Sequence, residues 1–421
     1  MAPKSPSSIP AGVIIAILFS TLFIGLLDNQ ILSPMLVEIS TSLHCQVTRV
    51  AGTVTAYAVM AGLTGLLIMP LADRGGRARF LKGAMVVVII ASLTATLAKH
   101  WLAFYVARVL AGLAGGIISA GVISYAADLF PYSQRGRVMG IISTSYFAAP
   151  ILGIPLSAQL VSWFGWRFVY GSLAALAGVL LGLMPHYLPE LLRPPTILRE
   201  TPYQNYKGIL NDRPRRLGVF SAFFISAGTG GFMTYLGPWL ATQFGLTVRE
   251  VAYVYLMAGL AALVGALLSG ALADRFGKKR VILLGNVLYI IILSRLYRLA
   301  YGPSLVLALG LAGLVAAFRY GPLQALLTQL VAANQRSAYI GIRNTVSQLG
   351  IAASVLVAGF LYQDAAGFAN IVIFSAGMIA LASVIIWRIA EPREEIINPA
   401  DAPAFGNASG STVGAPANTK E

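Results

Sequence analysis

The sequence predicts an all-α integral membrane protein with twelve transmembrane helices in two parallel six-helix halves. Three observations carry this prediction. Hydrophobic residues make up 57% of the 421 residues and charged residues only 11%, whereas a soluble globular domain carries about 25% charged residues. Apolar stretches long enough to cross a bilayer recur along the chain, and its two halves repeat the same motifs at one spacing. Strands are not expected, because an open sheet cannot satisfy its edge in lipid and the alternation of a β-barrel is absent.

Each predicted helix is an apolar stretch of roughly 18 to 25 residues, the length that crosses a hydrocarbon layer of about 30 Å. Six such stretches fall in each half of the chain, and the 43 glycines suit close helix packing in a bilayer. The predicted spans are residues 11–35, 49–69, 80–98, 101–125, 138–163, 168–188, 217–243, 251–273, 281–299, 304–331, 338–362 and 368–387.

An internal repeat relates the two halves. The run MPLADRGGRAR at Met69–Arg79 is matched by GALADRFGKKR at Gly270–Arg280, 201 residues later. The same offset relates three further pairs of segments: Gln134–Arg135 with Gln335–Arg336, Gly140 with Gly341, and Leu110–Gly112 with Leu311–Gly313. One offset that explains four segments indicates duplication. Parallel repeats in a membrane chain are the architecture of transporters that rock about a central site.

The net charge of +15 does not indicate nucleic-acid binding, because the basic residues lie in alternate loops rather than on one patch. They gather in the loops after the second, fourth, sixth and eighth predicted helices. By the positive-inside rule, both termini are then cytoplasmic. We therefore expect a multi-pass protein of a cell inner membrane.

The repeat also predicts the domain organisation. Residues 1–188 form an N-terminal half and residues 217–388 a C-terminal half, while the proline-containing residues 189–216 form a cytoplasmic linker. Residues 389–421, rich in small and polar residues, form a disordered cytoplasmic tail. The one cysteine, Cys45, excludes an intrachain disulfide and a cysteine metal cluster. The first apolar run is long enough to span the membrane and lacks a cleavage site, so we expect it to be retained.

The repeated loop resembles the signature of the major facilitator superfamily, G-x-L-a-D-r-x-G-r-[rk]. The second copy matches it at Gly270, Leu272, Ala273, Asp274, Arg275, Gly277, Lys278 and Lys279. The first copy keeps Asp73, Arg74, Gly76 and Arg77 in register and departs at Met69, where the family has a glycine. The resemblance covers nearly the whole chain and implies a transporter of twelve helices in two parallel sixes.

The charges around these loops are candidate gating residues. An aspartate just past one helix can accept hydrogen bonds from the free N–H groups at another helix's start, and nearby arginines can reach acids at neighbouring helix ends. The resemblance implies that Asp73 docks on the start of the eleventh helix and that Arg77 pairs with Asp128. The second half departs here, with Gln329 at the position equivalent to Asp128. The candidate gating set is Asp73, Arg74, Arg77, Asp128, Asp274, Arg275 and Lys278. The alternative is that these charges are topological anchors only.

Two further motifs are similar to those of the family's drug:proton antiporter branch. The fourth predicted helix carries the element R-x-x-q-G at Arg108–Gly112, with Ala111 in place of glutamine. The fifth carries the antiporter motif G-x-x-x-G-P-x-x-G-G at Ser145–Ile154, with other residues at three of its glycine positions. Pro150 removes a backbone donor and should bend this helix. The resemblance implies export, while the same small residues also serve ordinary helix packing.

Asp28 is the one acid well inside a predicted span, and Asn29 beside it adds polarity. A charge at the centre of a span costs about 2.5 to 3.5 kcal/mol on insertion scales, so it is seldom kept without a partner or a use. At about 1.5 Å per residue, Asp28 lies roughly 10 Å short of the outer end, and Arg108 lies at a similar depth. The family's first and fourth helices line its central cavity. Asp28 and Arg108 are therefore candidate partners, either as a site that takes up a proton when they separate or as a static salt bridge.

The remaining candidates for a substrate site are arginines and aromatic residues. Arg319 and Arg343, with Asn344, fall nearer the cytoplasmic face, where arginines usually snorkel. If they face the cavity instead, they favour an anionic or amphipathic substrate. The segment Tyr320–Pro322 predicts a helix irregularity. The aromatic candidates are Tyr57, Tyr146, Tyr235 and Trp239, each of which is alternatively a packing residue or an interface anchor.

These residues predict a proton-coupled secondary active transporter, an efflux antiporter for a small organic or amphipathic compound that works by alternating access. Its expected partners are that substrate, protons and the lipid bilayer, and we expect a monomer that binds no nucleic acid. The sequence contains no P-loop run and its three histidines are isolated, so we expect no enzymatic activity, cofactor or metal. Two alternatives stay open: an importer or exchanger of an organic anion bound by Arg108, Arg319 and Arg343, and a non-transporting receptor or assembly factor with a transporter fold.

Overall fold

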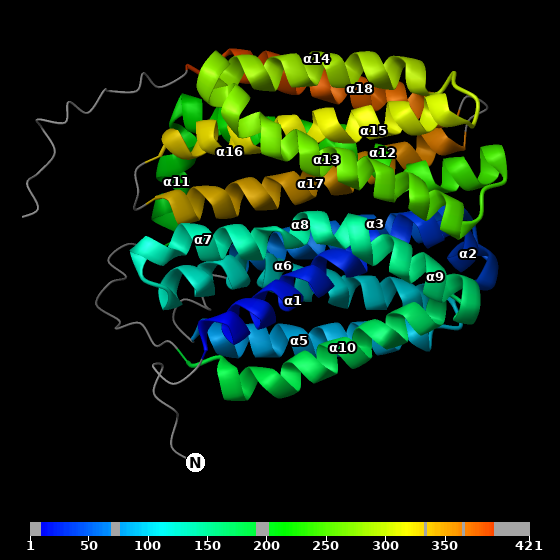
Figure 1. Ribbon diagram of the computed structural model, residues 1–421, viewed down its shortest axis with the longest axis horizontal. Coiled ribbons are helices and arrows are strands. Elements are labelled where there is room, and N and C mark those ends of the chain that lie inside the picture. Colours follow the sequence, from blue (N-terminus) through cyan, green and yellow to red (C-terminus); the bar gives the residue numbers. More distant parts are fainter. Residues whose placement is uncertain (1–9, 69–75, 191–201, 332–334, 364–366, 391–421) are drawn as a thin grey trace, which may run out of the picture. The chain divides into compact units, whose positions relative to one another are not determined.

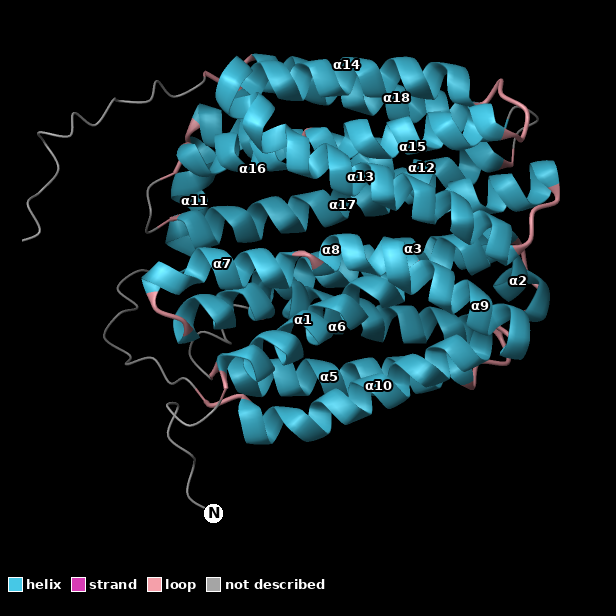
Figure 2. Cartoon of the chain, in the orientation of Figure 1, coloured by secondary structure: helices cyan, strands magenta, loops and turns pink. Residues whose placement is uncertain are grey.

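The computed structural model describes residues 10–68, 76–190, 202–331, 335–363 and 367–390. By their contacts, these described residues form one compact unit. The expected tail, residues 389–421, lies outside the described residues from position 391 onward. The predicted all-α fold is confirmed, because every regular element in the described ranges is a helix (Figures 1 and 2).

The first half of the chain folds into a series of helices of which two are interrupted. Its elements are α1 (Ala11–Gln30), α2 (Leu32–Ser42), α3 (Val47–Leu67), α5 (Arg77–Thr96), α6 (Trp101–Leu129), α7 (Tyr132–Ser143), α8 (Ser145–Ala148), the π-helical turn η2 (Ala149–Gly153), α9 (Ile154–Phe164) and α10 (Trp166–Tyr187). The expected first span ends at residue 35, but α2 carries the helix on to Ser42 after a break at Ile31. Pro34 explains the break, since it has no N–H to bond the carbonyl four residues earlier. Pro150 sits in η2, where the sequence predicts a bend.

The elements of the second half are α11 (Pro202–Asn211), α12 (Arg213–Phe244), α13 (Val248–Phe276), α14 (Lys278–Leu296), α15 (Pro303–Phe318), α16 (Tyr320–Gln329), α17 (Arg336–Tyr362) and α18 (Gly367–Trp387). The second half is interrupted at a different place, because α12 and α17 are continuous and the break lies between α15 and α16. Helix α11 lies within the expected linker. The irregularity expected at Tyr320–Pro322 falls at Arg319, which separates α15 from α16.

Within the described residues, eleven helical segments are long and apolar enough to cross a membrane. They correspond to eleven of the twelve predicted spans. The remaining predicted span, residues 281–299, corresponds to α14. Helix α14 has 19 residues, enough to cross the hydrocarbon layer, but four of them, Lys278, Lys279, Arg280 and Arg295, are charged. The number of membrane helices therefore agrees with the prediction.

The 201-residue offset is visible in the backbone. Gly76 and Gly277 precede α5 and α14, and both have φ of 91°. His44 and Gly245, also related by the offset, follow α2 and α12 with φ of 50° and 68°. Because this region of φ favours glycine, the two halves reverse direction by the same local conformation.

The offset is also visible in packing, and it explains why both halves carry the tripeptide Leu-Ala-Gly. A Cβ added at Gly112 of α6 would lie 2.4 Å from the carbonyl oxygen of Tyr57 on α3. A Cβ added at the equivalent Gly313 of α15 would lie 2.5 Å from the carbonyl oxygen of Ala258 on α13, which is the counterpart of Tyr57. Both glycines therefore let two helices cross at backbone contact, as small residues do in membranes.

The helix bundle has two ends. The C-terminal ends of α3, α6, α10, α13 and α16 lie at one end, on the left of Figure 1, which we call the terminal end because α1 begins and α18 finishes there. We call the opposite end the far end. The halves meet where α3 packs on α17, α2 on α12, and α8, η2 and α9 on α13. The contact of α2 with α12 involves the far-end part of the first membrane helix. The contacts of α8, η2 and α9 with α13 involve the fifth membrane helix.

Candidate functional site

The structure brings together Asp28 of α1 and Arg108 of α6, the two charges that the sequence analysis paired. Arg108 Nη1 lies 2.5 Å from Asp28 Oδ2 and also donates to the Asp28 carbonyl oxygen at 3.3 Å. Arg108 Nη2 donates to the side-chain oxygen of Asn29 at 3.3 Å. Arg108 is 1% exposed and Asp28 6% exposed. A charge pair so far from solvent interacts strongly, and either charge alone would carry a large desolvation cost.

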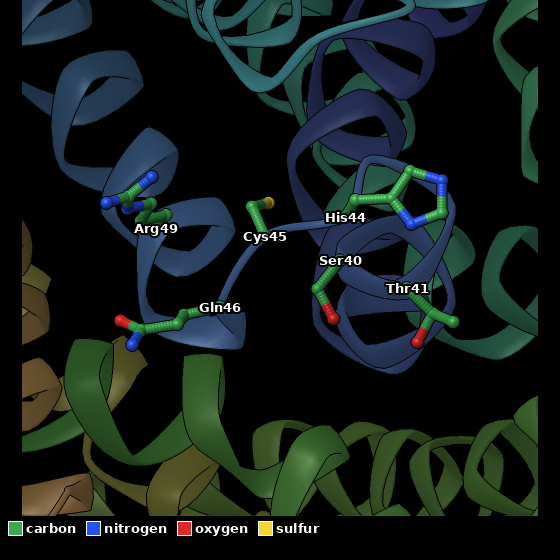
Figure 3. A pocket seen from close by; sticks show the side chains of 6 residues that line it. All are labelled: Ser40, Thr41, His44, Cys45, Gln46 and Arg49. Carbon is green, nitrogen blue, oxygen red and sulfur yellow. The ribbon is translucent and has the colours of Figure 1, made fainter.

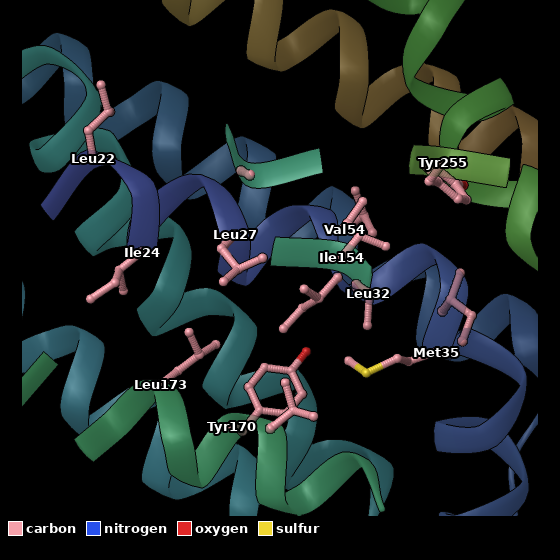
Figure 4. Packing of buried hydrophobic residues seen from close by; sticks show 14 of the residues in the cluster. Leu22, Ile24, Leu27, Leu32, Met35, Val54, Ile154, Tyr170, Leu173 and Tyr255 are labelled. Atoms are coloured by element: carbon pink, nitrogen blue, oxygen red, sulfur yellow. The ribbon is translucent and has the colours of Figure 1, made fainter. Parts of the chain in front are cut away.

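Two tyrosines surround the pair. The ring of Tyr57 on α3 lies under the guanidinium, with Arg108 Cζ 4.8 Å from the ring centroid, a cation–π arrangement. Tyr170 of α10 is in electrostatic reach of both Asp28 and Arg108, and its ring stands among the core side chains of the first half (Figure 4). In the described part of the chain, Arg108 Nε and the Tyr170 hydroxyl are buried and have no hydrogen-bond partner. The site thus retains unused hydrogen-bonding capacity.

The predicted pair Arg77 and Asp128 also lies together, at the terminal end. Arg77 is the first residue of α5, and its Nη1 lies 2.6 Å from Asp128 Oδ2 and 2.6 Å from the Ser124 carbonyl oxygen of α6. Arg77 is buried and Asp128 nearly so. The contact joins the third and fourth membrane helices within one half.

The other candidate gating residues are placed differently. Asp73 and Arg74 lie outside the described residues. Asp274 and Arg275 are exposed in the last turn of α13, and the Arg275 guanidinium lies 5.4 Å from the Phe276 ring centroid. Lys278 is the first residue of α14.

A contact that sequence reasoning missed closes α2 against α12 at the far end. The Ser33 hydroxyl lies 2.8 Å from the Met233 carbonyl oxygen, 2.9 Å from that of Thr234 and 2.7 Å from the Tyr255 hydroxyl. Gly237 permits the approach, since a Cβ there would lie 2.3 Å from the Ser33 carbonyl oxygen. A serine in an apolar run carries no charge signal. The signal that could have found it is the 201-residue offset, which pairs Ser33 with Thr234.

Arg343 of α17 forms a second polar group of residues. It donates a hydrogen bond to the side-chain oxygen of Gln324 on α16. Tyr146 of α8 and Tyr320 of α16 are in electrostatic reach of Arg343, and both are exposed. Asn344 is also exposed. Tyr146 belongs to the first half and Arg343 to the second, so residues of both halves form one polar region.

Arg319 is not part of this group. It is 2% exposed and turns toward α14, where it donates to the Asn286 side-chain oxygen at 3.2 Å and stands 4.7 Å from the Tyr289 ring centroid. Its Nε has no hydrogen-bond partner within the described ranges. Asn286 in turn donates to Ser383 of α18 at 2.9 Å. These contacts place Arg319 in the interior of the second half.

The aromatic candidates of α12 are packing residues in this structure. The ring of Tyr235 lies 4.9 Å from that of Tyr362 on α17. The Trp239 ring stacks on Phe368 of α18, with a centroid distance of 4.3 Å and an interplanar angle of 10°. Both side chains are buried, so their contacts bind helices of the second half to one another.

A polar pocket of about 440 Å³ opens at the far end, between α2 and α3 (Figure 3). It is lined by Ser40, Thr41, His44, Cys45, Gln46 and Arg49. Burial raises the pKa of the Cys45 thiol above its usual range, and the positive charge of Arg49 acts in the opposite direction. No group of three or more metal-ligating side chains occurs in the described residues.

Known transporters resemble this chain over most of its length. It is 24% identical over 378 residues to YceJ, an uncharacterized MFS-type transporter of Bacillus subtilis (strain 168), a match that covers 89% of this chain and 95% of that protein. It is 27% identical over 358 residues to a chloramphenicol efflux pump of Mycobacterium tuberculosis (strain ATCC 25618 / H37Rv), with coverage of 82% and 84%.

The fold matches the crystal structure of a D-xylose-proton symporter with a TM-score of 0.75 and 19% identity, over 90% of this chain and 98% of that one. The sequence model of the Major Facilitator Superfamily matches twice, over residues 18–217 and 218–416, once in each half. The two matches together span nearly the whole chain. This multi-pass membrane protein therefore belongs to the major facilitator superfamily of transporters.

Proposed function

We propose that this chain is a proton-coupled efflux antiporter for a small organic or amphipathic compound, and that Asp28 carries the proton. The observation that carries the proposal is the buried pair of Asp28 and Arg108 on two helices of the same half. The motif around Arg108 and the chloramphenicol efflux pump among the relatives support the direction of transport. The expected location is a bacterial inner membrane, with both termini cytoplasmic and the protein a monomer.

Coupling follows from the cost of an unpaired charge. While Arg108 Nη1 lies 2.5 Å from Asp28 Oδ2, the two buried charges balance each other. A rearrangement that moves Arg108 toward substrate, or moves α1 relative to α6, leaves a buried carboxylate without its partner, and proton uptake then removes the charge. Proton binding and conformation are therefore linked, and each shifts the other by the same free energy.

The proton gradient supplies sufficient energy for export. One charge moved across ~100 mV releases about 2.3 kcal/mol, and one pH unit adds about 1.4 kcal/mol. Together these support a several-hundredfold concentration ratio, since every 1.4 kcal/mol is a factor of ten.

Alternating access, in this proposal, is a rocking of residues 1–188 against residues 217–388, joined by the linker 189–216. The contact of Ser33 with α12 holds the far end together, so this structure corresponds to a state in which that end is closed. We assign the charges around Arg77 and Asp128, together with the repeated loop segments, to the gate at the terminal end, because ion pairs there can form in one state and break in the other.

The test is gradient-driven flux in liposomes that contain the purified chain and a pH-sensitive dye inside. A panel of amphipathic compounds that includes chloramphenicol is added, and proton movement is recorded with each compound. We expect Asp28→Asn to abolish proton-coupled flux while binding is kept, because the amide retains size and polarity but not the titrating proton. Glu38→Gln, the same change on α2, is the control and should transport normally. Full proton-driven flux in Asp28→Asn would exclude Asp28 as the carrier.

A second candidate function, exchange or import of an organic anion, is favoured by the surroundings of Arg343. Its guanidinium and the hydroxyls of Tyr146 and Tyr320 are suited to a carboxylate or phosphate. Counterflow with labelled organic anions separates this function from export: uptake that requires Arg343 and is unaffected by Asp28→Asn would favour the anion exchanger. A receptor without transport activity would bind ligand and show no flux in either assay.

A further inference from the structure

A small cavity lies beside Asp28, between the first, third and fourth membrane helices. Its volume is about 10 Å³, which is room for one water molecule. The residues that line it are Gly25 and Asp28 of α1, Val88, Ala91 and Ser92 of α5, and Ala111 and Gly115 of α6. Five of these seven have small apolar side chains or none, so Asp28 and Ser92 supply the polar side chains of the wall.

Ser92 is the informative residue of this wall. It is 1% exposed, and its hydroxyl makes no hydrogen bond to any group in the described residues. Other buried hydroxyls of the helices, such as those of Thr53 and Ser145, donate to a carbonyl oxygen one turn earlier. A buried hydroxyl left without a partner costs about 1 to 3 kcal/mol, and a partner in the cavity would remove that cost.

A third polar group lies beside two residues of this wall, Gly25 and Gly115. The Tyr57 hydroxyl lies against Gly115, where an added Cβ would come within 2.2 Å of it. Its hydrogen bond to the Gly25 carbonyl oxygen is long, at 3.4 Å. Two polar side chains in the wall, with the Tyr57 hydroxyl beside it, match the surroundings of buried water, which makes two to four hydrogen bonds, whereas dry cavities are apolar.

We propose that this cavity binds one water molecule, held between the Ser92 hydroxyl and the Asp28 carboxylate. The water gives the carboxylate a hydrogen-bond donor that does not leave when Arg108 moves. Ser92 is thus a positioning residue for the acid, acting through the water. The role in coupling rests on the proposed function; the binding of water does not.

The titratable and charged groups that face Asp28 are Arg108 on α6, Tyr57 on α3 and Tyr170 on α10. None of these is altered by the variants below, so a change in the behaviour of Asp28 reports on the cavity.

The experiment is infrared difference spectroscopy of the full chain in lipid bilayers, recorded across a pH series in ordinary and in heavy-oxygen water. Vibrations of Asp28 are identified by their loss in Asp28→Asn. Ser92→Ala removes the hydroxyl, and Ala91→Val fills the cavity while it leaves Ser92 in place. Ser375→Ala is the matched control, because Ser375 of α18 is equally buried and its hydroxyl also lacks a partner among the described residues.

We expect the unaltered protein to show an O–H stretching band that shifts in heavy-oxygen water and disappears in both Ser92→Ala and Ala91→Val. The stretching bands of the Asp28 carboxyl group should therefore shift in both variants, because the group loses one hydrogen-bond donor. Ser375→Ala should change neither property.

The proposal is overturned if the water band is absent, or if it persists in both cavity variants. Changes in Ser92→Ala alone would also overturn it, in favour of a direct hydrogen bond from Ser92 to Asp28. Failure of the proposed function looks different: Asp28 would then hold one protonation state across the pH series, while the water band would still respond to the cavity variants.

Discussion

The hydroxyl of Ser33 lies 2.9 Å from the carbonyl oxygen of Thr234, the residue to which the internal repeat relates it. Equivalent residues of two parallel halves can touch only close to the axis that relates the halves. The contact therefore lies near that axis, at the far end, and it joins the first and seventh membrane helices. Residues that hold this point should control how readily the halves separate there.

Gly237→Ala tests that control. An added methyl group would lie 2.3 Å from the Ser33 carbonyl oxygen, so α2 and α12 must move apart. We expect spin labels at Thr41 and Gln243, in a Cys45→Ser background, to report a longer far-end distance for most molecules. Gly182→Ala is the control, because a Cβ there meets nothing within 4 Å. An unchanged distance distribution in Gly237→Ala would show that this contact does not hold the far end closed.

The pair of Asp28 and Arg108 should show strong energetic coupling. Asp28→Asn and Arg108→Gln each leave a buried group without its partner, and each should lower the free energy of unfolding by about 3 kcal/mol. The double variant should lose much less than the sum of the two. The control cycle uses Lys82 and Glu190, a partly exposed pair at 3.0 Å, for which coupling of 0 to about 1 kcal/mol is expected. Additive losses for the buried pair would contradict the assigned interaction.

His44→Gly should stabilise the protein. His44 has φ of 50°, a conformation that costs a residue with a Cβ roughly 1 to 2 kcal/mol, and the second half has Gly245 at the equivalent position. Part of the gain is lost to the greater freedom of glycine in the unfolded chain. The expected net gain in the free energy of unfolding is about 0.5 to 1 kcal/mol, measured by denaturant titration. His100→Gly, at an extended residue, should give no gain, and equal effects at both positions would refute the explanation from φ.

Cys45 reports both reactivity and topology. Because burial raises the pKa of its thiol, little thiolate exists at neutral pH. The rate of alkylation should therefore rise about tenfold per pH unit until the pKa is passed. Arg49→Gln removes a charge that lowers this pKa, so labelling should slow at any pH below it.

If the far end faces outward, a membrane-impermeant maleimide should label Cys45 in intact cells and not the Cys45→Ser control. Labelling only after the cells are opened would reverse the proposed orientation.

The helices themselves could be predicted from the sequence because lipid imposes a simple rule. A segment in the bilayer must satisfy its backbone internally and must be apolar over about 20 residues, so the membrane helices appear as apolar runs and the repeat divides them into two sets. Asp28 and Arg108 were likewise predictable as partners, because a buried charge in lipid needs one. Pro150 and Tyr320–Pro322 marked the irregular helices because their effect on the backbone is local.

The tertiary structure alone decided which face of each helix meets which neighbour. In a bilayer both the lipid-facing and the protein-facing sides of a helix are apolar, so the hydrophobic pattern does not fix its rotation. For that reason the sequence could not assign Arg319 to α14, Tyr235 and Trp239 to packing, or Arg343 to Gln324. It also could not indicate Ser33 or Ser92, because the importance of each hydroxyl arises from groups that only the packing of the helices brings beside it.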